Sequence, residues 1–272
     1  MAIIFNTKPG FISGASASNT NRNFNENPFD RLSNGKRSNS AADDAAGLAL
    51  VSKLEAAMSE KEQAIRNAAD GQSLLSTADA GVAEVSTILN RMRELAIHAA
   101  NGTKSIAERE ALQSEADQLT AEISRIADST SFNGRTPLSG TQTDLQVGAS
   151  TNEQINVTID RMSASDLKLD GGRVSLDTSQ NAQDAIGAID AALLKVSSVR
   201  SYIGASVNRI SSSIDHMSNV AINKKTAAVS VSDFDFENER MRLTKSQMLQ
   251  QASIAMLAQG NASKGMMVQL IS

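Results

Sequence analysis

The chain contains no cysteine and no tryptophan, and it has one tyrosine and seven phenylalanines among its 272 residues. Without cysteine it can form neither a disulfide nor a thiolate-ligated metal site. The aromatic side chains that usually fill a thick core are scarce, and no phenylalanine lies between positions 30 and 131. This long stretch must therefore pack through Ala, Leu, Ile, Val and Met, which favours thin seams between helices over one compact globule.

Proline is also rare and occurs only at Pro9, Pro28 and Pro137, so residues 29–136 and 138–272 can form long helices. The net charge of −4, with its signs interspersed, offers no basic surface, and we expect no nucleic-acid partner. No run approaches the roughly 18 apolar residues of a membrane span. The N-terminus lacks a basic region followed by an apolar one. We therefore expect neither membrane insertion nor a cleaved signal peptide.

Apolar residues recur at steps of three and four in three segments, a spacing typical of helices that pack along a seam. This periodicity predicts a mainly α fold, a rod-like antiparallel helical bundle. The first seam comprises Val51, Leu54, Met58, Ile65, Ala68, Ala78, Val82, Val85, Leu89, Met92, Ala96 and Ala99; the second Leu112, Ala116, Leu119, Ile123 and Ile126; and the third Ile186, Ile189, Leu193, Val196, Ile203, Val207, Ile210, Ile214, Met217 and Ala221.

Helix boundaries follow from capping residues. Ser40 and Asp43 form a capping-box-like pair, which predicts a helix that begins near Ala41. Asn101-Gly102 should end this helix, and Ser105 with Glu108 forms a second capping box. Because the link between them is short, we expect the second helix to fold back antiparallel to the first.

The region from about residue 140 to 178 is the only one with a β pattern. Leu145 and Val147 alternate with polar residues, and so do Ile155, Val157 and Ile159. The intervening Ser, Thr and Asn residues are typical of a turn. The sequence therefore predicts a small β-hairpin between the helices.

Motifs at both ends and in the helices resemble those of bacterial flagellin, the subunit of the flagellar filament. The resemblance covers about residues 1–140 and 180–272. The matching motifs are Asn6-Thr7, Arg31-Leu32-Ser33 with Gly35, Asn39-Ser40-Ala41-Ala42-Asp43-Asp44-Ala45-Ala46-Gly47, Arg66-Asn67-Ala68-Ala69-Asp70-Gly71, Arg91 with Arg93-Glu94-Leu95-Ala96, Phe132-Asn133-Gly134, Gln250-Gln251-Ala252 and Met256-Leu257-Ala258-Gln259.

The resemblance implies a structural, non-enzymatic protein with no cofactor, which forms an extracellular filament for motility and lacks the large outer domains of longer relatives. It implies an N-terminal inner-core helix at 1–32, a spoke at 33–46, rod helices with the hairpin at 47–179, a rod helix at 180–232 and a C-terminal inner-core helix at 233–272. The two terminal helices should order only on polymerisation. Expected inner-core residues are Phe5, Phe11, Phe24, Leu32, Leu249, Met256, Leu257 and Leu270.

The terminal segments also depart from the family pattern. Pro28 lies within the expected first helix and predicts a kink or helix end near Asn27. Ser38 stands where relatives usually have an aliphatic residue, and the stretch 230–233 lacks the arginine of the corresponding turn. The methionines at the C-terminal end are interpreted as adaptable packing for an inner tube rather than as metal ligands.

The implied partners are further copies of the chain, the flagellar export apparatus, an export chaperone and the filament cap. In relatives, toll-like receptor five binds the rod helices. The positions of this chain that match those receptor contacts are Arg91, Leu95 and Glu115. The alternative interpretation is that Leu95 fills a seam and the two charged residues are solvated.

Three other classes remain open from the sequence. A hook–filament junction protein shares the terminal motifs. A chemoreceptor-like signalling hairpin also has long Ala-, Ser- and Gln-rich antiparallel helices. A lytic enzyme on a helical scaffold is the third, although no Gly-x-Ser-x-Gly nucleophile pattern is present.

Overall fold

The structure is a computed structural model that describes residues 29, 31–148, 150, 152–233 and 235–271. The chain forms two compact units, one comprising Ala57–Ile222 and the other the described residues on either side of that range. The elements are α2 (Ala45–Ala100), α3 (Ile106–Ser129), the 3₁₀ helix η1 (Pro137–Ser139), β1 (Gln142–Gln146), β2 (Gln154–Thr158), α4 (Ser179–Ser232) and α5 (Phe236–Ile271).

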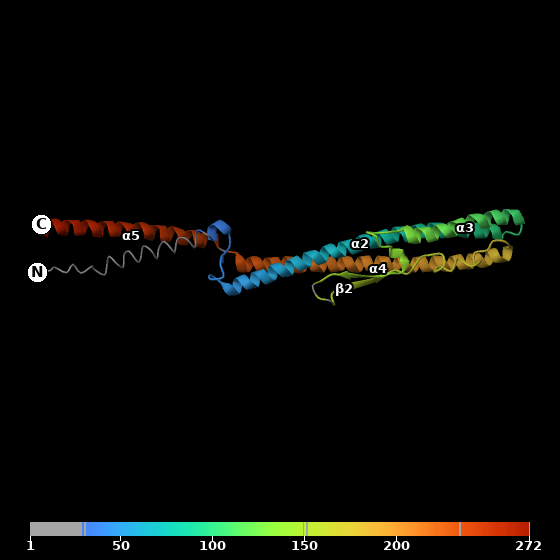
Figure 1. The fold of residues 1–272 in the computed structure, drawn as a ribbon, viewed down its shortest axis with the longest axis horizontal. Helices are drawn as coiled ribbons and strands as arrows, with labels where there is room; N and C mark the ends of the chain where they lie inside the picture. The colour runs from blue at the N-terminus through green and yellow to red at the C-terminus, as the bar shows by residue number, and fades with distance from the viewer. Residues whose placement is uncertain (1–28, 30, 149, 151, 234, 272) are drawn as a thin grey trace. The chain divides into compact units, whose positions relative to one another are not determined.

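In the unit Ala57–Ile222, α2 and α4 lie side by side, and α3 packs against them at one end (Figure 1). Two ion pairs show that α2 and α4 run antiparallel. Arg93 contacts Asp190 at 2.7 Å, and Asp79, earlier on α2, contacts Arg200, later on α4, at 3.1 Å. The predicted mainly α fold is confirmed.

The core of this unit combines most of the seam positions predicted from periodicity with buried residues of the region between α3 and α4. Along α2, every seam position from Ala78 to Ala99 is buried. The facing positions on α3 and α4 are buried or half-buried in the same cluster, including Ile123, Ile189 and Ile210. Small and branched side chains thus build a narrow core, as the shortage of aromatic residues predicts.

The turn between α2 and α3 follows the predicted boundaries. Helix α2 ends at Ala100, and α3 begins after the capping box. Glu108 accepts a hydrogen bond from the Ser105 backbone N–H at 2.8 Å, and the Ser105 hydroxyl accepts one from the Glu108 N–H at 3.3 Å. Hydrogen bonds from the Ser105 backbone and hydroxyl, and then Lys104, lower the pKa of Glu108 from 4.5 to about 2. The ionised cap is therefore complete above pH 4.5 and is lost as the pH falls toward 2.

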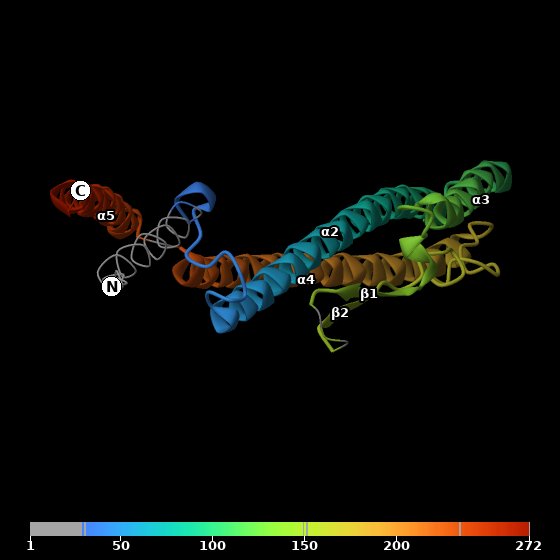
Figure 2. The ribbon, with the colours of Figure 1, turned by 60° about the vertical axis from the view of Figure 1, so that its left-hand side comes forward.

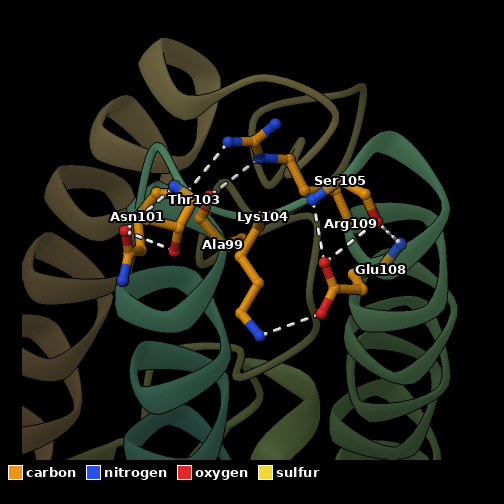
Figure 3. A network of polar contacts seen from close by, with 7 residues as sticks. All are labelled: Ala99, Asn101, Thr103, Lys104, Ser105, Glu108 and Arg109. Atoms are coloured by element: carbon orange, nitrogen blue, oxygen red, sulfur yellow. Dashed lines mark hydrogen bonds and ion pairs between the residues drawn. The ribbon is translucent and has the colours of Figure 1, made fainter.

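Arg109 holds the end of α2 from the first turn of α3 (Figure 3). Its buried guanidinium donates through Nε to the Ala99 carbonyl at 2.9 Å and through Nη2 to the Asn101 carbonyl at 3.1 Å. The Ser179 hydroxyl at the start of α4 donates to the Ala100 carbonyl at 2.5 Å. The last carbonyls of a helix lack intrahelical partners. These side chains donate hydrogen bonds to the carbonyls of Ala99, Ala100 and Asn101, and so connect the end of α2 to α3 and α4.

The predicted start of the first helix near Ala41 is wrong. Residues 40–43 form a separate turn, in which the Asp43 N–H donates to the Ser40 carbonyl at 3.1 Å. The helix begins at Ala45, because Asp44 accepts a hydrogen bond from the Gly47 N–H at 2.8 Å and acts as the cap. Ser40 was the predicted cap, and Asp44, four residues later, takes that role instead.

The predicted hairpin is present, with β1 and β2 antiparallel and paired from Gln142↔Thr158 to Gln146↔Gln154. Figure 2 shows it beside the helices of the same unit. Its inner face buries Ile155 and Val157.

Each outer edge of the hairpin meets a helix side chain. Val147 N–H donates to the Glu153 carbonyl at 2.9 Å, so the neighbouring Gln146 carbonyl points away from β2. The Asn67 amide on α2 donates to that carbonyl at 3.1 Å. On the other edge, Thr158 N–H donates to the Tyr202 hydroxyl on α4 at 3.2 Å. These contacts occupy part of both strand edges, which would otherwise be open to pairing with another chain.

Gly71 is the point of closest approach between the hairpin and α2. It is buried in the helix, and a Cβ added there would overlap the side chain of Leu145. Gly204 on α4 is the contrasting case, since an added Cβ would meet no atom within 4 Å. Packing against Leu145 therefore requires glycine at position 71, whereas position 204 has room for a side chain.

We predict that Gly71→Ala lowers the free energy of unfolding by about 1 kcal/mol, because overpacking outweighs the gain in helix propensity. Gly204→Ala, the matched control, should raise it by up to about 1 kcal/mol. Thermal unfolding by circular dichroism measures both effects, and the fluorescence of Tyr202, the only tyrosine, reports on docking of β2. Equal stabilisation by both substitutions would show that the hairpin does not pack on Gly71.

Candidate functional site

The second unit contains the junction between α4 and α5. Helix α4 ends at Ser232 and α5 begins at Phe236. Asp235 caps α5, since its Oδ1 accepts hydrogen bonds from the N–H groups of Glu237 at 3.1 Å and Asn238 at 3.2 Å. The break lies where the resemblance places the start of the C-terminal inner-core segment; the functional division of the chain into five segments stays a prediction.

Residues from the N-terminal side of the chain contact this junction. Arg31 pairs with Glu239 of α5 at 3.6 Å, and the Glu239 side chain is only 8% exposed. The Arg37 N–H donates to the Ser232 carbonyl at 2.8 Å, and its guanidinium pairs with Asp44 at 3.0 Å. The segment before α2 thus holds both the end of α4 and the first turn of α5.

Helix α5 carries an apolar face that the described residues leave exposed. Met241, Met248, Ala252 and Met256 are spaced by seven, four and four residues, which places them on one side of a helix. The exposed fractions of the three methionines are 60%, 64% and 77%. A groove on this side is lined by Glu237, Arg240, Met241, Thr244, Lys245, Met248, Leu249 and Ala252. An exposed apolar face of this kind marks an interaction surface.

Two of the predicted inner-core residues belong to this region. Leu249 lines the groove and is 47% exposed, and Met256 continues the same face. Leu32 is half-buried before α2. The other predicted residues lie outside the described part of the chain. The structure does not describe Phe5, Phe11, Phe24 or Pro28, and it does not describe the side chains of Leu257 and Leu270.

The three positions matched to receptor contacts lie on α2 and α3 but do not share one surface. Arg91 pairs with Glu115 of α3 at 2.8 Å and with Glu94 at 3.1 Å, and it is exposed. The hydrogen bonds that Arg91 donates to Glu115 and then to Glu94 raise the pKa of Arg91. Leu95 is only 4% exposed and belongs to the core. Arg91 is therefore accessible to a partner, whereas Leu95 fills a seam.

Neither the Arg31–Glu239 pair nor the Asp235 cap was predicted from the sequence. An aspartate directly before a segment with acidic residues in its first turn is the usual sequence signal of such a cap. No local signal relates Arg31 to Glu239, because their contact depends on how distant parts of the chain fold. Across the described residues, the helices are all too polar or too short to serve as membrane-crossing segments.

Residues 12–143 match the bacterial flagellin N-terminal helical region, and residues 186–271 match the bacterial flagellin C-terminal helical region. A flagellin of Halalkalibacterium halodurans is 40% identical over 253 residues, which cover 92% of this chain and 93% of that protein. A flagellin of Listeria innocua is 34% identical over 259 residues, covering 89% and 90%.

The fold is also similar to that of a protein assigned as flagellar hook-associated in Vibrio parahaemolyticus. The TM-score is 0.59 at 18% identity, and the match covers 70% of this chain and 100% of that one. At this identity the similarity concerns the fold alone.

These matches define a structural protein of the bacterial flagellum. The chain belongs to the flagellin family, the structural subunits that self-assemble into the extracellular flagellar filament. The hook–filament junction and chemoreceptor-like alternatives are not favoured.

We predict that Glu239→Gln destabilises the contact between α5 and the segment that precedes α2 by about 1 kcal/mol, because Arg31 loses its ionic partner. In assembled filaments, amide hydrogen exchange at residues 31–35 should become roughly fivefold faster. Glu110→Gln, which removes an exposed negative charge from α3, is the control and should leave exchange there unaltered. Identical exchange in both variants would contradict a stabilising role for the Arg31–Glu239 pair.

Proposed function

We propose that this flagellin polymerises through its two terminal segments, 1–32 and 233–272, which pack with the same segments of other copies as an inner tube. Residues 47–232 then form the outer rod with its hairpin, and residues 33–46 connect the two. The observation that carries the proposal is the exposed apolar face of α5. A face that meets a different face of the next copy generates an open helical filament.

The distribution of apolar residues on α5 favours several neighbours rather than one. Besides the methionine face, Phe236 and Ile254 are 56% and 54% exposed, and their spacing places them on the other side of the helix. A helix with apolar residues all round is stable when it is surrounded. Burial of each Leu, Ile, Phe or Met side chain contributes about 1.5–3 kcal/mol, which can offset the ordering of the terminal segments on assembly.

The export apparatus, an export chaperone and the filament cap belong to the same proposal. A chain without disulfides can be threaded through a channel once its helices separate. Before assembly the apolar face of α5 would favour nonspecific association. A chaperone that covers this face during export, and a cap that holds the chain until it docks, would prevent that.

Deletion of residues 253–272 tests the polymerisation proposal. The truncated chain loses Met256 and the apolar surface beyond it, so it should not form filaments even when seeded. Circular dichroism should show that the monomer retains most of its helicity, because the core of Ala57–Ile222 is unchanged. Electron microscopy and sedimentation measure assembly, and normal filaments from the truncated chain would rule the proposal out.

Recognition by toll-like receptor five is a second candidate function, supported by the exposed Arg91 with its partner Glu115. Arginine is frequent among residues that dominate binding energy at interfaces. Arg91→Ala should therefore raise the concentration needed for half-maximal signalling by about tenfold. Arg125→Ala is a matched control, since Arg125 is also exposed and pairs with a glutamate, Glu122. An unchanged dose response for Arg91→Ala would reject this contact.

A further inference from the structure

Among the methionines whose side chains the structure describes, most are either strongly exposed or buried, and Met58 on α2 is half-buried. Met241, Met248, Met256 and Met266 of α5 are 57–77% exposed. Those in the core of Ala57–Ile222, Met92, Met162 and Met217, are at most 3% exposed. Because the chain has no cysteine, methionine is its only sulfur-containing residue. Among the described side chains, the thioethers of Met241, Met248, Met256 and Met266 are therefore the most accessible targets for oxidants that attack sulfur.

We propose that the exposed methionines of α5 are a site of reversible oxidation by hydroperoxides, and that their oxidation blocks assembly of the filament. In the reaction the thioether sulfur attacks the terminal oxygen of the peroxide, and the O–O bond breaks. The sulfur loses two electrons and gains one oxygen, and hydrogen peroxide is reduced to water. The sulfoxide product can be reduced back to the thioether by methionine sulfoxide reductases.

The position of these methionines links the chemistry to assembly. Met241 and Met248 line the groove on α5, and Met256 continues the same face. A thioether is apolar and adapts to its neighbours, whereas a sulfoxide is polar and needs a hydrogen-bond donor. Each sulfoxide that is buried without a donor should weaken association by about tenfold.

The inference rests on the proposed function, because it assumes that this face is covered in the filament. It also predicts a difference between two states of the same protein. The sulfur atoms of α5 are reactive while the chain is unassembled, and they are protected once neighbouring copies pack over them. Oxidation would then act on newly exported subunits and spare the filament already built.

The test treats unassembled protein with dilute hydrogen peroxide and locates added oxygen atoms by peptide mass mapping. Seeded elongation is then followed by sedimentation and electron microscopy. We expect oxidation at Met241, Met248, Met256 and Met266 before any at Met92, Met162 or Met217, and a loss of elongation of at least about tenfold. Treatment with methionine sulfoxide reductases should restore elongation.

A variant that carries Leu at positions 241, 248, 256 and 266 provides the matched control. Met and Leu are of similar volume, so the substitutions should preserve packing, and elongation of this variant should resist peroxide. If it does not assemble at all, rescue of the oxidised natural chain by the reductases still tests the inference. Normal elongation of the oxidised chain, failure of the reductases to restore it, or sensitivity of an assembling Leu variant would each overturn the inference.

The deletion of residues 253–272 separates the two proposals. If the truncated chain still forms filaments, the inner-tube proposal fails, and this inference fails with it. If the deletion blocks assembly but oxidation does not, only the oxidation inference is wrong.

Discussion

The long helices depend on the burial of one narrow apolar stripe that runs between them. A single helix of 56 residues cannot bury its own apolar side chains, and helices gain most of their stability from tertiary packing. In α2 the stripe is rich in small residues, and Ala68, Ala78, Ala96 and Ala99 are completely buried. Such residues allow close approach, so a thin rod can have a continuous core without aromatic side chains.

Other features of the structure stabilise the packing of this stripe. Arg109 and Ser179 satisfy the carbonyl groups where α2 ends, and they hold the three helices in register at that end. The hairpin covers part of the stripe where Gly71 allows Leu145 to approach. The unit Ala57–Ile222 is therefore complete within one chain, whereas α5 is not, because its apolar face is left exposed. This contrast is the physical basis of the proposal that α5 carries the polymerisation surface.

Much of the fold could be predicted from periodicity and capping. The seams, the capping box at Ser105 and the hairpin are local patterns, and the structure confirms them. The start of α2 could not be decided locally, because Ser40 and Asp44 are both good caps and differ only in what surrounds them.

The site was less predictable because its contacts join distant residues. That Leu95 fills a seam was an alternative left open by the sequence, and no sequence pattern showed that Arg91 pairs with Glu115. The pair of Arg31 and Glu239 depends on tertiary folding in the same way. The exposed face of α5 became evident only when the burial of its residues was known, since the sequence of α5 has apolar residues on several sides.

The central claim is that α5 lies inside the filament and the helices of Ala57–Ile222 lie outside it. Helical reconstruction of the assembled filament by electron cryo-microscopy tests this claim most directly. The account predicts that the face formed by Met241, Met248 and Met256 is covered by neighbouring copies near the filament axis. A filament in which this face is open to solvent at the outer surface would contradict it.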